Sequence, residues 1–300
     1  MINNKINSRE MVLYARAKIN PTLDVIGKLD NGYHNLEMTM QTVNTYDTLK
    51  ITPNNTGEIK LITNIDWLPT DEKNLVYKTA NYLKQTYNIQ EGIKINLYKN
   101  IPVSAGLAGG STDCAATLIA IRNMFKLPIS NEELESIGKQ LGADVPFCLQ
   151  RGTALARGIG DELTQLKPFP YCYIVIVKPS ISVSTRSVFE RLDLNSLDKS
   201  SRPDTEKFLY YLNKSNLEGI CDNLSNVLES VTLNQYPILH KIKYLLKKYG
   251  ALGTLMSGSG SSIYGIFRTK KQAVFASKSI SRNVRIQDIF VTTPFNNFNK

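Results

Sequence analysis

The chain has 300 residues, of which 42% are hydrophobic and 21% are charged, and its formal net charge is +10. This length and balance are typical of a soluble globular protein with one large or two moderate domains. The longest apolar run beside a strand, YCYIVIV at 171–177, is far shorter than the roughly 20 residues of a membrane span. The N-terminal MINNKINSREM has no apolar stretch of a secretory signal, so we expect a cytoplasmic protein.

The cysteines and the positive charge set further limits. Cys114, Cys148, Cys172 and Cys221 form no CxxC pair, which argues against a zinc site and a disulfide framework. The charge favours anionic partners, which include nucleic acid, membrane surfaces and small anions. The densest lysine pairs fit solvent-exposed helix faces, so the charge does not choose among these partners.

The first half of the chain is predicted to begin with β-structure and continue with helices. Hydrophobic periodicity and start signals predict strands at 11–18, 23–27 and 35–51, a helix from 75 to about 87, a strand at 93–98, and helices at 113–125 and 131–141. Ser130 and Glu133 have capping-box spacing, and Gly142 ends the last of these helices.

The second half is predicted to mix helices with a small sheet. The expected elements are a strand at 172–177, helices around 187–192, 204–212, 223–228 and 238–248, paired strands at 252–256 and 262–267, a helix at 270–281 and a final strand at 284–291. This β-α-β-β-α-β-like order predicts a ferredoxin-like second domain. We place the boundary between about 160 and 170, around Leu166-Lys167-Pro168, which gives domains at 1–165 and 166–300.

The most informative segment is PVSAGLAGGST at 102–112, between the strand at 93–98 and the helix at 113–125. Glycines let backbone N–H groups approach an anion, and a helix N-terminus adds unpaired donors and a favourable dipole. The segment fits a phosphate-binding loop and, about equally well, a tight turn capped by Ser111 or Thr112. It lacks the Gly-Lys-Ser/Thr ending of a P-loop, and no GxGxxG opens the helix.

Two charged residues are candidates for catalysis. Asp144 lies in GADVPF, between a helix end and an apolar, strand-like segment. It fits a proton acceptor at a cleft edge and also a turn-forming aspartate. Lys18, in ARAKINP, would snorkel outward or point inward to a carboxylate, for which Asp144 is a suitable partner.

Aromatic and small residues suggest ligand contacts. Tyr33 and His34 follow the turn Asp30-Asn31-Gly32, which would present both rings for stacking on a base. The loop SGSGSS at 257–262 fits a plain hairpin or a second wall close to the phosphate loop. Cys114 is either a thiol with a pKa lowered by the helix dipole or a buried small residue.

Four segments taken in order resemble the GHMP kinase superfamily. They are AKINPTLDVIGKLDNGYH, NIPVSAGLAGGSTDCAATL, LGADVPF and GTLMSGSGSSIYGIF, and the resemblance runs over nearly the whole chain, roughly from Tyr14 to Phe267. The resemblance implies the α+β, two-domain GHMP kinase fold, with an S5-like N-terminal domain and a ferredoxin-like C-terminal domain. It also implies that ATP and the substrate bind in a cleft between the domains.

Within this superfamily, Gly32-Tyr33-His34 together with GADVPF is similar to members whose alcohol substrate carries a cytidine diphosphate. The resemblance implies ATP-dependent phosphorylation of the 2-hydroxyl group of a cytidyl-diphosphate methylerythritol, a step of the non-mevalonate isoprenoid pathway. It implies Asp144 as the general base and Lys18 as its charged neighbour. Tyr33 and His34 would recognise cytosine, and Phe189 would meet the other face of the base.

The resemblance also implies a nucleotide site. Asn20 would lie beside the reacting end of the substrate, whereas Lys99 and Asn74 are weaker candidates for the adenine side. Ser111 or Thr112 would help to position Mg²⁺, and no dedicated metal ligand is predicted. The ATP phosphates would be held by Pro102, Val103, Ser104, Ala105, Gly106, Leu107, Ala108, Gly109, Gly110, Ser111 and Thr112.

Two departures from the family pattern and two rivals remain. Ala108 stands where many relatives have glycine, which costs little if its φ is negative, and Cys114 replaces a usual small residue.

One rival function is that of a GHMP kinase for mevalonate, phosphomevalonate or homoserine, which carry no base to stack. The other is a nucleic-acid binder, for which salt-dependent RNA affinity is expected. We expect a monomer or weak homodimer without nucleic-acid or membrane partners.

Overall fold

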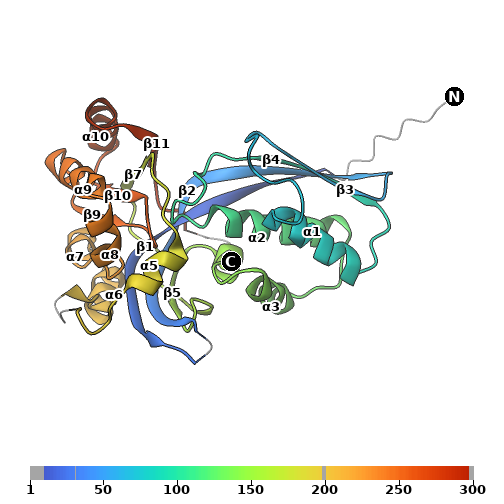
Figure 1. Ribbon diagram of the computed structural model, residues 1–300, viewed down its shortest axis with the longest axis horizontal. Coiled ribbons are helices and arrows are strands. Elements are labelled where there is room, and N and C mark those ends of the chain that lie inside the picture. The colour runs from blue at the N-terminus through green and yellow to red at the C-terminus, as the bar shows by residue number, and fades with distance from the viewer. Residues whose placement is uncertain (1–9, 31, 198–200, 297–300) are drawn as a thin grey trace. The chain divides into compact units, whose positions relative to one another are not determined.

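The computed structural model describes residues 10–30, 32–197 and 201–296 (Figure 1). Interleaved segments of the chain form two compact units. The first unit contains the residues up to Ala15, Tyr46–Asn100 and Gly110–Leu149, and the second contains Arg16–Thr45, Ile101–Gly109 and the residues from Gln150 onward. The predicted division at 165/166 is a single cut in the chain, and it stays a prediction.

The strands and helices of the described residues are defined as follows. They are β1 (Met11–Lys28), β2 (His34–Asn54), β3 (Ile59–Thr63), α1 (Leu75–Thr86), β4 (Gly92–Tyr98), α2 (Gly109–Met124), α3 (Asn131–Leu141), α4 (Val145–Gln150), β5 (Thr153–Arg157), β6 (Glu162–Gln165), β7 (Tyr173–Pro179), α5 (Thr185–Arg191), α6 (Thr205–Asn213), α7 (Leu217–Asp222), β8 (Ser225–Asn226), α8 (Glu229–Gln235), α9 (Ile238–Lys248), β9 (Gly253–Met256), β10 (Ile263–Phe267), α10 (Lys270–Asn283) and β11 (Ile286–Thr292).

The first unit packs helices α1, α2 and α3 against one side of its strands (Figure 1). Strand β4 is antiparallel to the C-terminal half of β2 and parallel to β3. Alternation along β4 buries Ile93, Ile95 and Leu97 and leaves Lys94 and Tyr98 exposed. A sheet with one buried face alternates in this way, so the pattern explains why the helices cover only that face.

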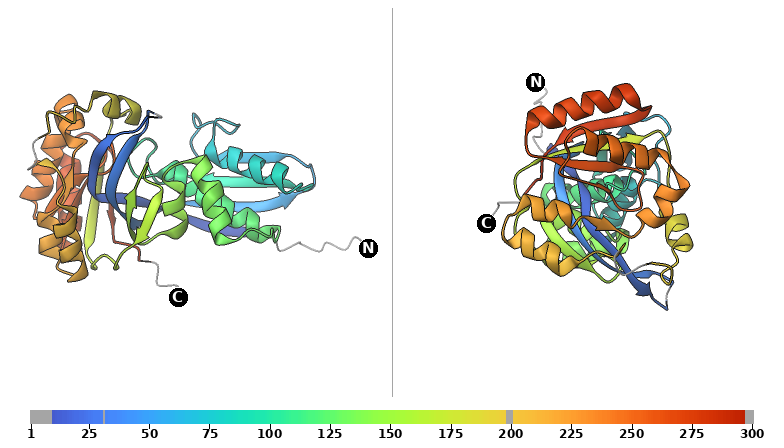
Figure 2. Two further views of the ribbon diagram at one scale, coloured as in Figure 1. Left: turned by 90° about the horizontal axis from the view of Figure 1, so that it is seen from below. Right: turned by 90° about the vertical axis from the view of Figure 1, so that its left-hand side faces the viewer.

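The second unit contains an antiparallel sheet in the order β11-β7-β10-β9. The first and third of these strands along the chain are therefore central, and α10 connects the third strand to the fourth. This is the ferredoxin-like arrangement that the sequence predicts. Figure 2 shows α9 and α10 on one face of the sheet. The α+β fold class is confirmed.

The opposite face of this sheet carries the glycine-rich loop. Ile174 and Ile176 of β7 belong to a buried cluster that also contains Ala105 and Leu107 of the loop. Gly265 of β10 faces α9 instead, since a Cβ there would meet Leu246 at 3.1 Å. The sheet thus supports the loop on one face and packs helices on the other.

The second unit also includes the neighbouring parts of β1 and β2. Strand β5 pairs with both β2 and β6, and β1 lies between β2 and the short β8. The tight loop between β1 and β2 is closed by hydrogen bonds from Leu29 N to Tyr33 O (2.8 Å) and from Gly32 N to Leu29 O (3.0 Å). A turn is predicted here from Asp30-Asn31-Gly32, and Asn31 of this turn lies outside the described residues.

Several predicted elements are wrong. The segments 11–18 and 23–27 form one strand that passes through Pro21, and the helix expected from 113 begins at Gly109. Residues after Asp144 form α4 rather than a strand, because Pro146 is tolerated in a first helical turn. The helix predicted at 223–228 is absent: α7 ends at Asp222, and β8 pairs with β1. Tertiary pairing outweighs local helix propensity there.

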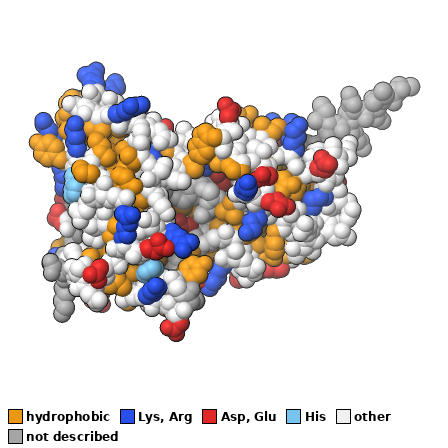
Figure 3. All heavy atoms as spheres, in the orientation of Figure 1, with side chains coloured by type: hydrophobic (Ala, Val, Ile, Leu, Met, Phe, Trp, Pro, Cys, Tyr) orange, Lys and Arg blue, Asp and Glu red, His pale blue; other side chains and the backbone are white. Residues whose placement is uncertain are grey.

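The charge is unevenly spread on the face shown in Figure 3. Lys and Arg side chains gather over α9 and α10, whose sequences contain no Asp or Glu, and elsewhere on this face they are interspersed with Asp and Glu. Across the described ranges, no helix combines the length and apolar character needed to cross a bilayer.

Candidate active site

The glycine-rich loop adopts a strained backbone held by close contacts. Ser104, Gly106 and Ala108 all have positive φ angles, of 54°, 75° and 56°. A Cβ at Gly106 would lie 2.1 Å from the carbonyl oxygen of Ser257, so only glycine fits this position. In this loop, residues in the left-handed conformation alternate with residues in other conformations. Such alternation turns the backbone sharply, as in anion-binding loops.

The SGSGSS loop is the wall behind this glycine loop. Ser257 Oγ donates to Gly106 O at 2.9 Å, and Ser262 N donates to Ala105 O at 3.3 Å. The four serines at 257, 259, 261 and 262 are all buried. Of the two sequence-based interpretations, the structure therefore favours a second wall over a plain exposed hairpin.

The φ of Ala108 is positive, so the condition under which alanine costs little at this position is not met. A left-handed conformation costs an L-residue with a Cβ about 1–2 kcal/mol. Replacing Ala108 by glycine removes this cost, but it also increases the conformational entropy of the unfolded chain. That increase cancels about 0.4–1 kcal/mol of the gain in stability. We therefore expect Ala108→Gly to raise the free energy of unfolding by about 0.5–1 kcal/mol, measured by urea denaturation.

A matched control for this prediction lies in the following helix. Ala116 is inside α2, where the same exchange should lower the free energy of unfolding by about 1 kcal/mol or more. A loss of stability in both variants would show that residue 108 is not strained.

Lys18 and Asn20 come together on the same side of β1. Lys18 is only 5% exposed, and its Nζ donates to Asn20 Oδ1 at 2.7 Å. Two further hydrogen bonds hold Asn20 in place. Its Nδ2 donates to Thr39 O at 3.3 Å, and its backbone carbonyl oxygen accepts from Tyr264 Oη at 3.0 Å. Lys18 N also donates to Leu107 O at 3.1 Å, which places this lysine beside the glycine loop.

Asp144 belongs to the first unit, whereas Lys18 belongs to the second. Asp144 immediately precedes α4, is partly buried, and its carbonyl accepts from Cys148 N at 3.1 Å. An aspartate at a helix start is favoured by the unpaired N–H groups of the first turn. The pairing of Asp144 with Lys18, and its role as the base, stay predictions.

The predicted base-binding residues cluster in the second unit. The rings of His34 and Phe189 have centroids 4.9 Å apart and an interplanar angle of 30°, and Tyr33 is 61% exposed at the loop. Burial lowers the pKa of His34, and the Lys28 ammonium lowers it further, which favours a neutral imidazole. No local sequence pattern predicts this ring contact, since α5 and β2 are far apart in the sequence, and only the family resemblance implies that the two residues lie close together.

The spacing of these two rings sets a condition on ligand binding. A base between them needs a centroid separation of about 7 Å, twice the contact distance of about 3.5 Å. The observed 4.9 Å is shorter. A base can therefore insert only if the rings separate, or it can stack on an outer face of either ring.

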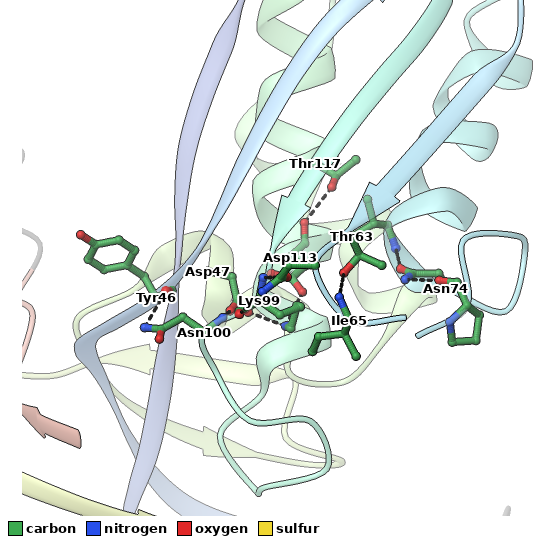
Figure 4. Close-up of polar contacts among 12 residues, drawn as sticks. Tyr46, Asp47, Thr63, Ile65, Asn74, Lys99, Asn100, Asp113 and Thr117 are labelled. Carbon is green, nitrogen blue, oxygen red and sulfur yellow. Dashed lines mark hydrogen bonds and ion pairs between the residues drawn. The ribbon is translucent and has the colours of Figure 1, made fainter. Parts of the chain in front are cut away.

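The two weaker adenine-side candidates both have structural partners in the first unit (Figure 4). Asn74 is the N-cap of α1: its Oδ1 accepts from Val76 N at 2.9 Å, and its Nδ2 donates to Pro69 O at 2.7 Å. Lys99 forms ion pairs with Asp47 and Asp113. Contacts of these residues with adenine stay predictions.

Electrostatics keep Lys99 charged within this cluster. Burial by itself lowers the pKa of Lys99, but the Asp113 and Asp47 carboxylates outweigh it, so the pKa is raised. Burial raises the pKa of Asp113 well above its usual value, Lys99 opposes this, and Asp47 adds to it. Sequence reasoning missed Asp47 and Asp113, because nothing in the local pattern links β2 to α2.

The first turn of α2 contains Ser111 and Thr112, and Asp113 follows directly after it. Because the helix begins at Gly109, neither Ser111 nor Thr112 is the N-cap of the alternative tight-turn interpretation. Cys114 is fully buried beside Thr79, and burial raises the pKa of its thiol to about 12. This excludes a thiolate at neutral pH and favours the packing role.

Two family models match this chain. The model "GHMP kinases N terminal domain" matches residues 74–152, and "GHMP kinases C terminal" matches residues 208–286. The loop, the sheet order and these matches define the class of a GHMP kinase. A homoserine kinase from Cytophaga hutchinsonii shares the fold, with a TM-score of 0.77 at 22% identity over 96% of each chain.

Relatives and a solved structure narrow the class. The 4-diphosphocytidyl-2-C-methyl-D-erythritol kinase of Caldicellulosiruptor saccharolyticus is 45% identical over 96% of this chain and 98% of its own length. The kinase of the same name from Clostridium botulinum is 46% identical over 94% and 99%. A crystal structure of 4-(cytidine 5'-diphospho)-2C-methyl-D-erythritol kinase matches with a TM-score of 0.81 at 28% identity, over 96% and 100%. The chain therefore belongs to the 4-diphosphocytidyl-2-C-methyl-D-erythritol kinase family.

Proposed function

We propose that this chain transfers the γ-phosphoryl group of ATP to the 2-hydroxyl group of 4-diphosphocytidyl-2-C-methyl-D-erythritol, a step of isoprenoid precursor synthesis. The family membership supports the reaction, and the His34–Phe189 pair is the observation that carries the substrate assignment. Aromatic rings stack on any nucleobase, whereas mevalonate and homoserine offer no base to stack.

In the proposed reaction, the 2-hydroxyl oxygen attacks the γ-phosphorus as the bond from the γ-phosphorus to its bridging oxygen breaks and ADP leaves. Asp144 accepts the hydroxyl proton, while Lys18, held by Asn20, stabilises the developing negative charge. The backbone N–H groups of residues 102–112 hold the ATP phosphates. Phosphoryl transfer depends mainly on positioning and electrostatics, so this set of groups is sufficient.

Mg²⁺ fits this site as an ion carried by the nucleotide. Mg²⁺ is usually held by substrate phosphates, water and one or two protein oxygens, and the Ser111 and Thr112 hydroxyl groups in α2 are suitable donors. Within the described part of the chain, no group of three or more His, Cys, Asp and Glu could hold a metal ion by itself. When bound, Mg²⁺ would neutralise part of the negative charge of the phosphates.

The substrate assignment is tested by comparing three alcohols. ADP release by the purified protein with ATP and Mg²⁺ is expected with the cytidyl diphosphate substrate and not with mevalonate or homoserine. Activity on either of the other alcohols instead would leave only the superfamily assignment. The cytoplasmic location and the monomeric or weakly dimeric state remain predictions of the sequence.

Removal of the aromatic face should weaken binding of the cytidyl substrate selectively. Stacking of a base on an aromatic side chain contributes about 1–3 kcal/mol, so Phe189→Ala should raise the KM for this substrate about tenfold or more. The KM for ATP should not change, because Phe189 lies on α5 and contacts His34. Steady-state kinetics with each substrate varied in turn provide the measurement.

Phe189→Tyr is the matched control for this prediction, because it keeps the ring face. It should retain a nearly normal KM for the cytidyl substrate. Equal KM values for Phe189→Ala and the unmodified protein would show that Phe189 does not contact the base.

A further inference from the structure

A buried cluster of charges lies where the glycine-rich loop begins and ends (Figure 4). Lys99 follows β4, Asp113 lies just after the first turn of α2, and Asp47 lies on β2. Their side chains are only 4%, 3% and 0% exposed. All three belong to the first unit, and the roles predicted for catalysis and substrate binding use neither aspartate.

The lysine joins the two carboxylates directly. Lys99 Nζ lies 2.6 Å from Asp113 Oδ2, and it also forms an ion pair with Asp47. The other oxygen of Asp47 accepts from Asn100 N at 2.5 Å. Asn64 fixes the backbone of Lys99 from a second side, because its Oδ1 accepts from Lys99 N at 2.8 Å and its Nδ2 donates to Lys99 O at 3.1 Å.

The positions of these residues in the chain indicate what the cluster does. Lys99 precedes the loop 102–112, and Asp113 follows it immediately. The Lys99–Asp113 ion pair therefore connects the two stems of the loop, and Asp47 ties the first stem to the sheet. We propose that Lys99 and Asp113 are positioning residues that clamp the ends of the phosphate-binding loop, with Asp47 as the anchor of the clamp.

This inference rests on the proposed function of the loop, and it differs from a contact of Lys99 with adenine. The ammonium group already has two carboxylate partners in the buried cluster. Buried charges hold their partners strongly, because an unpaired buried charge is costly. A clamp of this kind fixes where the loop N–H groups point before the nucleotide arrives, which is how preorganisation raises affinity.

Two isosteric variants of the cluster separate a clamp from general stabilisation. Asp113→Asn and Asp47→Asn each remove one buried carboxylate from the same lysine, but only Asp113 lies on the second stem. The measurement is the Kd for ADP without Mg²⁺, by calorimetry, on variants shown to be folded by thermal unfolding. We expect Asp113→Asn to raise the Kd about tenfold, which is within the range of couplings in a contact network, and Asp47→Asn to raise it only about twofold.

Lys99→Met completes the experiment through a double-mutant cycle. If Lys99 and Asp113 act as a pair, Lys99→Met should weaken ADP binding as much as Asp113→Asn does, and the double variant should be no weaker than either single one. If the increases in Kd of the two single variants instead multiply in the double variant, the clamp is overturned, and the two residues contact the nucleotide separately. If Lys99→Met does not fold, the comparison of the two aspartate variants decides the question.

Three other outcomes would also overturn the proposal. Equal changes in Kd for Asp47→Asn and Asp113→Asn would indicate a general structural role, and unchanged ADP binding in both would indicate no role in positioning. A loss for Asp113→Asn that appears only with Mg²⁺ would indicate that Asp113 contacts the ion. ADP binding needs no cytidyl substrate, so these failures are distinct from an unmodified protein that does not phosphorylate that substrate.

Discussion

Asp144→Asn is expected to lower kcat by about 10²–10⁴, the usual contribution of a positioned general base. Asparagine has nearly the same shape and can still accept a hydrogen bond, but it cannot take the proton of the attacking hydroxyl group. The KM values for ATP and for the cytidyl substrate should change little, because Asp144 acts on the reacting proton. Initial rates at saturating concentrations of both substrates provide the measurement.

A matched exchange in the same unit controls for general effects of the lost charge. Asp71 is exposed in the loop before α1, where its Oδ1 accepts from Lys73 N at 3.0 Å. Asp71→Asn should keep the kcat of the unmodified protein. If Asp144→Asn also keeps a normal kcat, then Asp144 does not accept the proton, and at most it orients the hydroxyl group.

Gly106→Ala is expected to cause the largest loss of stability among the single exchanges considered. The new Cβ would lie 2.1 Å from Ser257 O and 3.0 Å from Gly260 O, and both are backbone atoms that cannot move by a rotamer change. The residue also has a φ of 75°. The left-handed backbone costs about 1–2 kcal/mol and the overpacking a further 1–3, so the free energy of unfolding should fall by about 2–5 kcal/mol.

Urea denaturation of Gly106→Ala and Gly27→Ala measures this effect against a matched exchange. A Cβ at Gly27 on β1 would meet no atom within 4 Å. Gly27→Ala should therefore change the free energy of unfolding by no more than about 0.5 kcal/mol, as is usual for surface substitutions. Similar stabilities for the two variants would contradict the close backbone contact between the glycine loop and the SGSGSS loop.

Local patterns predicted most elements of the fold. The cap of α3 is an example: Ser130 Oγ accepts from Glu133 N at 3.1 Å, as the capping-box spacing predicts, and Gly142 ends the helix. The paired strands β9 and β10 also follow from local turn chemistry. These features depend on neighbours within a few residues, which the sequence displays directly.

Long-range pairing explains what local patterns could not predict. Strand β8 forms because Ser225 and Asn226 pair with Thr22 and Leu23, about 200 residues earlier. The site shows the same limit. The motif residues were predicted, whereas the Asp47 contact with Lys99 and the positive φ of Ala108 depend on the tertiary surroundings of those residues.

The most direct test of the proposed reaction is phosphorus NMR of the product formed from ATP and the cytidyl diphosphate substrate. The carbon at position 2 carries a methyl group and no hydrogen, so a phosphate on its hydroxyl has no proton three bonds away. The proposed reaction predicts a new phosphomonoester signal without three-bond proton splitting, alongside an intact diphosphate. A split phosphomonoester signal would place the phosphate on another hydroxyl group, and ATP left unconsumed would contradict the proposed function itself.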